Sequence, residues 1–110
     1  LGLLLPLLLH EAHTSGRSLS ELAAFAAERP ARAFGIARKG RLETGYDGDL
    51  VLVDLDCART VGLDAPFSPS CGWSPYEGRR LQGWPVTTIL LGEIVAQNGV
   101  LLTEGRGRAL

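Results

Sequence analysis

The run from Lys39 to Asp54 most constrains how this chain can fold. It reads Lys-Gly-Arg-Leu-Glu-Thr-Gly-Tyr-Asp-Gly-Asp-Leu-Val-Leu-Val-Asp. We expect a short strand ending near Leu42, a chain reversal over residues 43–48, and a strand over residues 50–53 that stops at Asp54. Glycines supply backbone freedom in the reversal, and four consecutive apolar residues are typical of a strand covered on both faces. The pattern therefore predicts a hairpin.

Helical patterns precede this run. The first helix is expected over residues 3–13, with Pro6 in its first turn, where a missing N–H has no cost. Its first half is apolar all round, which predicts that the helix is covered on most sides. Ser18 and Glu21 form a capping box at the start of a second helix. Pro30 is expected to end that helix and to open a third, over residues 30–34, closed by Gly35.

After Gly35 the chain is expected to form strands and turns. Residues 63–83 form a long stretch rich in proline and glycine, which we expect to be irregular. The predicted strands cover residues 59–61, 86–91, 94–96 and 100–102, with tight turns at Gly92-Glu93 and Asn98-Gly99. Helices followed by strands indicate an α+β chain.

Composition places the chain among soluble globular domains. It has 110 residues, 45% of them apolar and 21% charged, with a net charge of −1. Nothing in this balance indicates a nucleic-acid or membrane partner. The two cysteines, Cys57 and Cys71, are interpreted as reduced thiols of a cytoplasmic protein, with a single disulfide as the alternative.

The beginning of the chain indicates that it is part of something longer. It contains no Met and opens inside an apolar run, so we expect that Leu1 is not the natural start. The apolar run of residues 1–9 is shorter than the roughly 20 residues that span a bilayer. It also lacks the charged lead-in of a signal peptide. We therefore expect a buried helix.

The motif His10-Glu11-Ala12-His13 resembles a zinc motif but fails its spacing. A zincin places two histidines at i and i+4 on one helix face, whereas His10 and His13 are three positions apart and are the only histidines. A catalytic zinc takes three protein ligands, so Glu11 would have to supply the third. We interpret the two histidines as exposed polar residues near a helix C-terminus.

Two further groups are weighed as sites. Four aspartates could hold calcium or act as paired carboxylates, but the spacing does not fit an EF-hand, and we interpret them as turn formers and strand-end residues: Asp47, Asp49, Asp54 and Asp56. Aromatic and basic residues in and beside the long loop could form a binding patch, or could fix that loop to the body of the protein: Trp73, Tyr76, Trp84, Arg79 and Arg80. No catalytic, cofactor-binding or metal-binding residue can be assigned.

The order of several motifs resembles the C-terminal end of a dihydroorotase of the amidohydrolase superfamily, whose hydantoinase and allantoinase members have similar tails. The motifs are the Leu-Pro-Leu run at residues 3–9, Arg-Ser-Leu-Ser-Glu at 17–21, Arg-Pro-Ala-Arg-Ala-Phe-Gly at 29–35, the Lys39–Asp54 stretch, Ser-Pro-Tyr-Glu-Gly at 74–78, Gly-Trp-Pro-Val-Thr-Thr-Ile at 83–89, and Gly-Glu-Ile-Val at 92–95.

The resemblance implies a fold and a division of the chain. Residues 1–36 would be the last helices of a (β/α)8 barrel, residues 37–104 the C-terminal part of a small β-sandwich, and residues 105–110 a flexible tail. It implies a zinc-dependent parent enzyme, a homo-oligomer, that reversibly opens the cyclic amide dihydroorotate in pyrimidine biosynthesis. Metal ligands and the catalytic aspartate of that family precede this segment, so the segment itself would hold no zinc.

Other interpretations stay open. The substrate could be a hydantoin or allantoin, because those relatives share the same tail. The parent could instead be a dihydroorotase-like subunit without activity that scaffolds a partner enzyme, or the chain could be a small β-sandwich interaction module. Whether the chain belongs to an active enzyme is therefore left undecided by the sequence.

Overall fold

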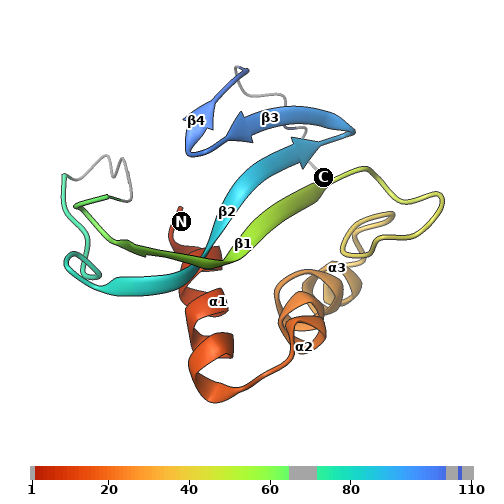
Figure 1. Cartoon of the computed structure of the whole chain (residues 1–110). Helices are drawn as coiled ribbons and strands as arrows, with labels where there is room; N and C mark the ends of the chain where they lie inside the picture. The colour runs from red at the N-terminus through yellow and green to blue at the C-terminus, as the bar shows by residue number, and fades with distance from the viewer. Residues whose placement is uncertain (1, 65–71, 104–106, 108–110) are drawn as a thin grey trace.

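Helices occupy the first third of the chain and one antiparallel sheet follows. The computed structural model describes residues 2–64, 72–103 and 107. The strands form a four-stranded sheet in the order β1-β2-β3-β4 (Figure 1). The elements are α1 (Leu4–Ser15), α2 (Leu19–Ala23), the π-helical η1 (Ala24–Glu28), α3 (Arg29–Ala33), β1 (Leu50–Thr60), β2 (Arg80–Leu90), β3 (Glu93–Gln97) and β4 (Val100–Leu101). This is the expected α+β arrangement.

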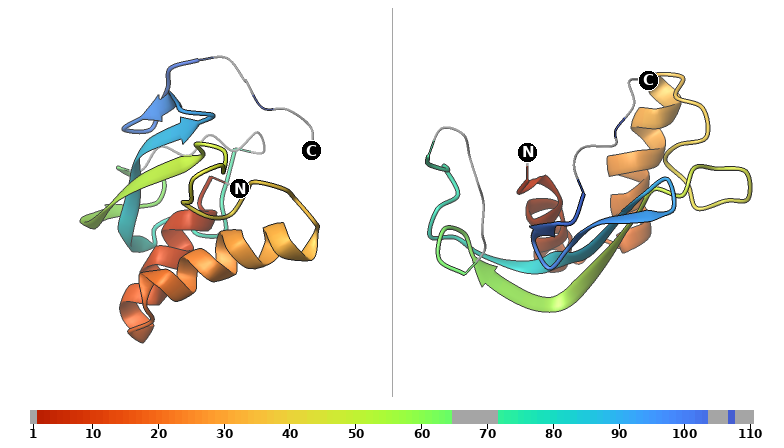
Figure 2. Two further views of the ribbon diagram at one scale, coloured as in Figure 1. Left: turned by 90° about the vertical axis from the view of Figure 1, so that its right-hand side faces the viewer. Right: turned by 90° about the horizontal axis from the view of Figure 1, so that it is seen from above.

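The long ribbon of β1 and β2 is bent, and the helices lie on its concave side (Figure 2). Helix α1 crosses the ribbon at β2, whereas α2, η1 and α3 lie farther along, nearer the start of β1 (Figure 1). In the described part of the chain no helix has the length and apolar character needed to span a bilayer.

Helix α1 begins and ends close to where the sequence predicts. Pro6 lies in the first turn and is buried, where its missing N–H breaks no helical hydrogen bond. Gly16 adopts a left-handed conformation and its N–H bonds to the carbonyl of Ala12, which ends the helix. Pro6, Leu9 and Ala12 are buried, but Leu4 is 58% exposed. The described chain thus covers only part of this apolar helix.

The prediction that Pro30 ends the second helix is wrong. The predicted capping box is confirmed: the Ser18 hydroxyl accepts the N–H of Glu21, and the Glu21 carboxylate accepts that of Ser18. Helical backbone then continues to Ala33, because the chain widens into the π-helical η1 just before the proline. A widened turn accommodates a residue that has no N–H and whose ring crowds the preceding turn. Gly35 ends the helix as predicted, in a left-handed conformation.

The predicted hairpin at residues 39–54 is wrong in two respects. Residues 37–49 form turns and irregular backbone, so no strand ends near Leu42. Strand β1 starts as predicted but continues past Asp54 to Thr60 and pairs with β2. The Asp54 carboxylate accepts the N–H groups of Asp56 and Cys57 at 3.0 and 3.2 Å. It thereby stabilises a bulge, so the sequence signal for a strand end marks an irregularity within a longer strand.

The burial of β1 and the position of the turn before β3 also differ from the predictions. Leu52 is 55% exposed, so β1 is not covered on both faces. The turn before β3 is formed by Leu91 and Gly92, both with positive φ, one residue earlier than predicted. The turn at Asn98-Gly99 is confirmed, again with two positive φ values. Both match the type I′ geometry that suits hairpins. The expected flexible tail, residues 105–110, lies outside the described residues except for Gly107.

The irregular segment before β1 is anchored to the β2–β3 turn. The Asp49 carboxylate accepts the N–H of Leu91 at 2.8 Å and an ion-pair hydrogen bond from Lys39. The Gly92 N–H bonds to the Gly48 carbonyl at 2.9 Å. The hydrogen bond from Lys39, followed by that from Leu91, lowers the pKa of Asp49, and the hydrogen bond to Asp49 raises the pKa of Lys39. The start of β1 is thereby fixed to the far end of β2.

The core lies where α1 crosses β2. Val61, Leu81 and Trp84 are buried, and residues of α1, β1 and the segment before β2 pack around them: Leu3, Leu7, Cys57 and Tyr76. The Trp84 indole N–H donates to the Leu81 carbonyl at 2.9 Å, as a buried polar group requires. Next to Trp84, Gly83 lies against the Leu9 side chain of α1: a Cβ there would meet the Leu9 Cβ at 2.8 Å.

We expect Gly83→Ala to destabilise the chain more than Gly78→Ala does. Both glycines have positive φ, but nothing lies within 4 Å of a Cβ built on Gly78. The two variants therefore share a backbone penalty, and only Gly83→Ala pushes α1 away from β2. The additional loss of unfolding free energy should be about 1–3 kcal/mol, measured by urea denaturation. Equal losses in both variants would show that α1 is not held tightly on Gly83.

We expect Asp49→Asn to lower the stability at pH 7 by more than it does at acidic pH. A carboxylate with a lowered pKa stabilises the fold above its ordinary pKa of about 3.9 and loses that contribution as the pH falls through the lower folded value. Asparagine keeps an oxygen for the Leu91 N–H but removes the charge that Lys39 binds. Thermal unfolding between pH 7 and acidic pH measures the difference in melting temperature between the variant and the wild type. Asp56→Asn, at an exposed site on β1, is the control; a similar gap there would contradict the anchor.

Candidate functional site

The structure assigns the two histidines of α1 to different environments. His10 is half-buried, and its Nδ1 accepts the backbone N–H of Gln82 on β2 at 3.1 Å. His13 and Glu11 are exposed. The interpretation of both histidines as exposed polar residues is correct for His13 and wrong for His10. Because Nδ1 of His10 is already bonded, the histidines act separately: one links a helix to a strand and the other faces solvent.

The aspartates serve the backbone and ion pairs of the fold. Asp47 pairs with Arg38 at 3.0 Å and with Lys39 at 3.1 Å, and Asp49 belongs to the anchor described above. Asp54 holds the bulge of β1, and Asp56 is exposed. The interpretation as turn formers agrees with the positions of Asp47 and Asp49, whereas Asp54 and Asp56 lie within β1 and not at a strand end. Within the described ranges, no three His, Cys, Asp or Glu side chains gather into a group that could hold a metal ion.

A second charged contact joins the helical layer to the irregular segment. Arg41 donates to Glu28 at 2.7 Å. The hydrogen bond from Arg41 lowers the pKa of Glu28, and the same bond raises the pKa of Arg41. Beside it, Gly40 approaches η1 so closely that a Cβ would lie 2.7 Å from the Ala27 carbonyl oxygen. These contacts hold the segment after α3 back against the helix and serve a structural purpose.

The aromatic residues contribute mainly to the core. Trp84 is 7% exposed, and the Arg59 guanidinium lies 5.9 Å from its ring centroid. Arg79 lies 5.8 Å from the ring of Tyr76, which packs on the core. Both are cation–π distances. Trp73 is 61% exposed. Tyr76 and Trp84 therefore fix the loop region to the body of the protein, whereas Trp73 lies at the surface.

Of the two cysteines, the structure describes Cys57. Cys57 is a free, half-buried thiol on β1 whose sulfur accepts the Arg59 Nε–H at 3.4 Å. Cys71 lies outside the described residues.

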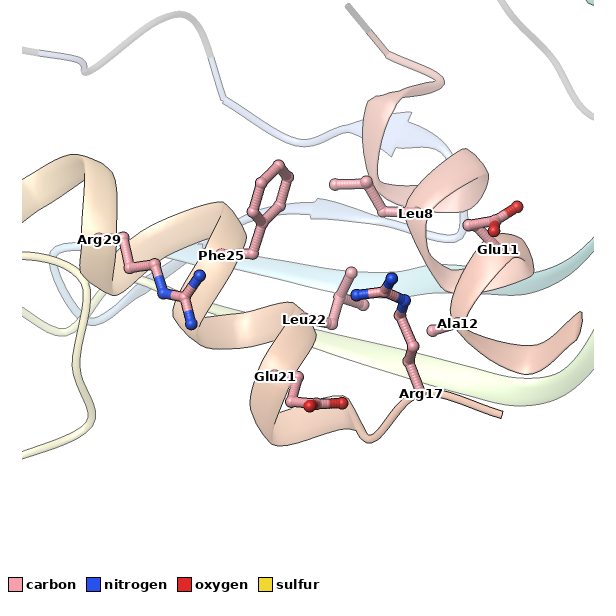
Figure 3. A pocket seen from close by; sticks show the side chains of 8 residues that line it. All are labelled: Leu8, Glu11, Ala12, Arg17, Glu21, Leu22, Phe25 and Arg29. Carbon is pink, nitrogen blue, oxygen red and sulfur yellow. The ribbon is translucent and has the colours of Figure 1, made fainter. Parts of the chain in front are cut away.

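A hollow separates α1 from α2 and η1 (Figure 3). Its volume is about 280 Å³, and it is lined by apolar side chains from both helices and by charged residues around them: Leu8, Ala12, Leu22 and Phe25, with Glu11, Arg17, Glu21 and Arg29. Leu8 and Ala12 face Leu22 and Phe25 across it. No nucleophile with a neighbouring base lines it. The arrangement suits an apolar segment packed between two helices rather than a reacting group.

Sequence reasoning missed this hollow and the contact of His10 with Gln82. The apolar spacing of Leu8 with Ala12, and of Leu22 with Phe25, signals one apolar face on each helix. It does not show that the two faces oppose each other. A larger hollow of about 820 Å³ lies between the α2–η1 face and the segment that leads into β1. Both hollows adjoin the helical layer.

Comparison with known proteins agrees with the resemblance noted from the sequence. Residues 2–95 match the model of the amidohydrolase family. The chain is 38% identical to a dihydroorotase from Methanothermobacter thermautotrophicus over 98% of this chain and 25% of that protein. It is 39% identical to an allantoinase from Deinococcus radiodurans over 86% of this chain and 20% of that protein.

A solved structure shows the same arrangement of elements. The L-hydantoinase (dihydropyrimidinase) from Arthrobacter aurescens superimposes with a TM-score of 0.77 and 37% identity, over 91% of this chain and 22% of that one. The chain thus spans between a fifth and a quarter of the length of these relatives. With a family model matching most of its residues and close relatives in three of its enzyme classes, the chain belongs to the amidohydrolase family.

Proposed function

We propose that this chain is the C-terminal part of a dihydroorotase-like cyclic amidohydrolase and that it serves the parent enzyme as structure. The observation that carries the proposal is the alignment of nearly the whole chain with about a quarter of a dihydroorotase. Dihydroorotate is the proposed substrate of the parent and zinc its proposed metal, held by residues outside this segment. Hydantoin or allantoin is the alternative substrate, because hydantoinases and an allantoinase are among the relatives.

The helical layer would contribute to the barrel. We assign residues 1–36 to the last barrel helices. The half-covered α1 and the apolar hollow between α1 and η1 support this assignment, because the outer helices of such a barrel pack their apolar faces on its strands. Leu8, Leu22 and Phe25 would then contact barrel strands, and Arg17 and Arg29 would stay at the rim.

The sheet would form part of a sandwich. We assign residues 37–104 to the C-terminal share of that domain. Residues paired across strands point to the same face of a sheet. The strand pairing therefore places five apolar residues on one face: Leu50, Leu52, Ile89, Ile94 and Val100. Leu52, Ile94 and Val100 are 55%, 48% and 59% exposed. A second sheet packed on this face would bury them, and a segment of the parent would supply it.

The experiment that tests the proposal compares this chain with a longer product of the same gene. We expect the purified 110-residue chain to bind less than one zinc per molecule and to open neither dihydroorotate, hydantoin nor allantoin, because it presents no assigned ligand set. The longer product should carry zinc and turn over dihydroorotate fastest. Metal analysis and ring-opening assays measure both.

Each outcome has a distinct meaning. Turnover by the short chain would overturn the structural role. Faster turnover of hydantoin or allantoin by the long product would replace the proposed substrate. A long product that folds but has neither metal nor activity would favour the scaffold alternative over an enzyme.

We also expect the short chain to self-associate through the exposed sheet face. Leu52→Lys places a charge on that face and should raise the monomer fraction in light scattering, because the apolar patch is what favours association. Leu63→Lys is the matched control, since Leu63 is 84% exposed but lies in a turn after β1. An equal gain in both variants would indicate a general charge effect and would remove this support for a missing second sheet.

A further inference from the structure

The turn between β3 and β4 contains the only asparagine of the chain, and a glycine follows it. Asn98 and Gly99 are the two residues of this turn, both exposed and both with positive φ. Asparagine is chemically labile in proteins, because the backbone nitrogen of the next residue can attack its side-chain carbonyl carbon. Glycine presents that nitrogen without a side chain that would hinder the attack. The pair is therefore a candidate for spontaneous loss of the side-chain amide.

The reacting groups of this pair are not held by other contacts. In the described part of the chain, no hydrogen bond involves the side-chain amide of Asn98 or the N–H of Gly99. The N–H of Asn98 donates to the Val86 carbonyl at 2.8 Å. That bond fixes the nitrogen of the asparagine itself, whereas the attacking nitrogen belongs to Gly99. The nucleophile and its target are thus both available at the surface.

The strand after the turn is held by few contacts. Strand β4 consists of Val100 and Leu101, which are 59% and 75% exposed and pair with β3 at the edge of the sheet (Figure 1). Beyond them, the Leu102 N–H bonds to the Val95 carbonyl at 2.9 Å. Segments with so little burial open locally at a free energy far below that of global unfolding. The turn therefore reaches the conformations that ring closure requires while the rest of the chain stays folded.

The other residue pair that could form the same ring is restrained. Asp47 precedes Gly48, and its carboxylate pairs with Arg38 at 3.0 Å and with Lys39 at 3.1 Å. The Asp47 side chain is only 16% exposed. An ionised carboxylate is a poor target for a nucleophile, and two ion pairs hold this one. Asp47 therefore serves as an internal reference for Asn98.

We propose that Asn98 is a modification site at which the chain deamidates, and that the isoaspartyl product opens the β3–β4 hairpin. The Gly99 nitrogen bonds to Cγ of Asn98, the bond from Cγ to Nδ2 breaks, and ammonia leaves with the proton of the Gly99 N–H. Water then opens the five-membered succinimide and returns a proton to the Gly99 nitrogen. Attack of water at Cγ gives isoaspartate's isomer, aspartate, whereas attack at the main-chain carbonyl gives isoaspartate. The reaction needs no metal, cofactor or partner, so this inference is independent of the proposed function.

The two products differ in their effect on the hairpin. Aspartate before glycine suits a type I′ turn, so the aspartyl product keeps the strand pairing. In isoaspartate the chain continues through the side chain, which adds one methylene to the main chain of the turn. Register in a hairpin is fixed by the length of its turn, so the longer turn shifts it. The pairs of Gln97 with Val100 and of Ala96 with Leu101 are then lost.

The test follows deamidation by mass spectrometry in the full 110-residue chain at pH 8. Digestion and electron-transfer fragmentation locate the added mass and distinguish isoaspartate from aspartate. Asn98 should deamidate no more than roughly tenfold more slowly than in an unstructured peptide of residues 95–102, because the hairpin opens locally. A rate that approaches the roughly thousandfold slowing expected when ring closure needs global unfolding would overturn the proposal. So would isoaspartate that forms as fast at Asp47 as at Asn98.

A matched variant tests the effect on the hairpin. Asn98→Asp carries the same added charge as both products but keeps the ordinary main chain, so its Leu102 amide should be protected from hydrogen exchange as in wild type. In the isoaspartyl fraction, separated by chromatography, this protection should be lost, a fall of up to roughly tenfold for one hydrogen bond of ordinary strength. Full protection in the isoaspartyl fraction, or an equal loss in Asn98→Asp, would show that the longer main chain does not open the hairpin.

Discussion

The contact of α1 with β2 is the constraint on which the rest of the described structure depends. The buried side chains of Val61, Leu81 and Trp84 lie there, with Leu7 of α1 and the preceding Leu3 packed on them. Gly83 lets the helix backbone approach the strand, and Gln82 donates to His10 beside it. Away from this contact, Arg41 in the segment between α3 and β1 donates to Glu28 of η1. A small apolar core therefore positions the two layers, and charged contacts at the rim fix their connection.

Local sequence signals predicted those parts of the fold that depend on local chemistry. The capping box of Ser18, the left-handed Gly35 and the turn at Asn98-Gly99 all follow from the preferences of single residues for particular backbone conformations. The failures are cases in which non-local contacts override such preferences. Pro30 does not end its helix, because η1 widens before it. Asp54 does not end its strand, because pairing with β2 resumes beyond the bulge.

The candidate site residues also fall into two groups: those whose roles follow from local chemistry and those whose roles depend on non-local contacts. That Asp47 and Asp49 serve turns and ion pairs was predictable, because aspartate in a glycine-rich segment favours such positions. The role of His10 was not predictable, since the Gln82 N–H comes from a strand 72 positions away. Sequence alone also gives no reason why the turn before β3 uses Leu91 with positive φ. The structure supplies one: in that conformation the Leu91 N–H reaches Asp49.

The uncovered surfaces are as informative as the core. A stable domain rarely leaves a run of Leu, Ile and Val side chains half exposed on one sheet face while an apolar hollow opens between its helices. Here both occur, on two different layers. A longer chain that lies against the helices and also adds strands over the sheet would cover both. The size of the relatives agrees with such a chain. The packing of the segment and its proposed place in a larger amidohydrolase thus lead, by independent arguments, to the same interpretation.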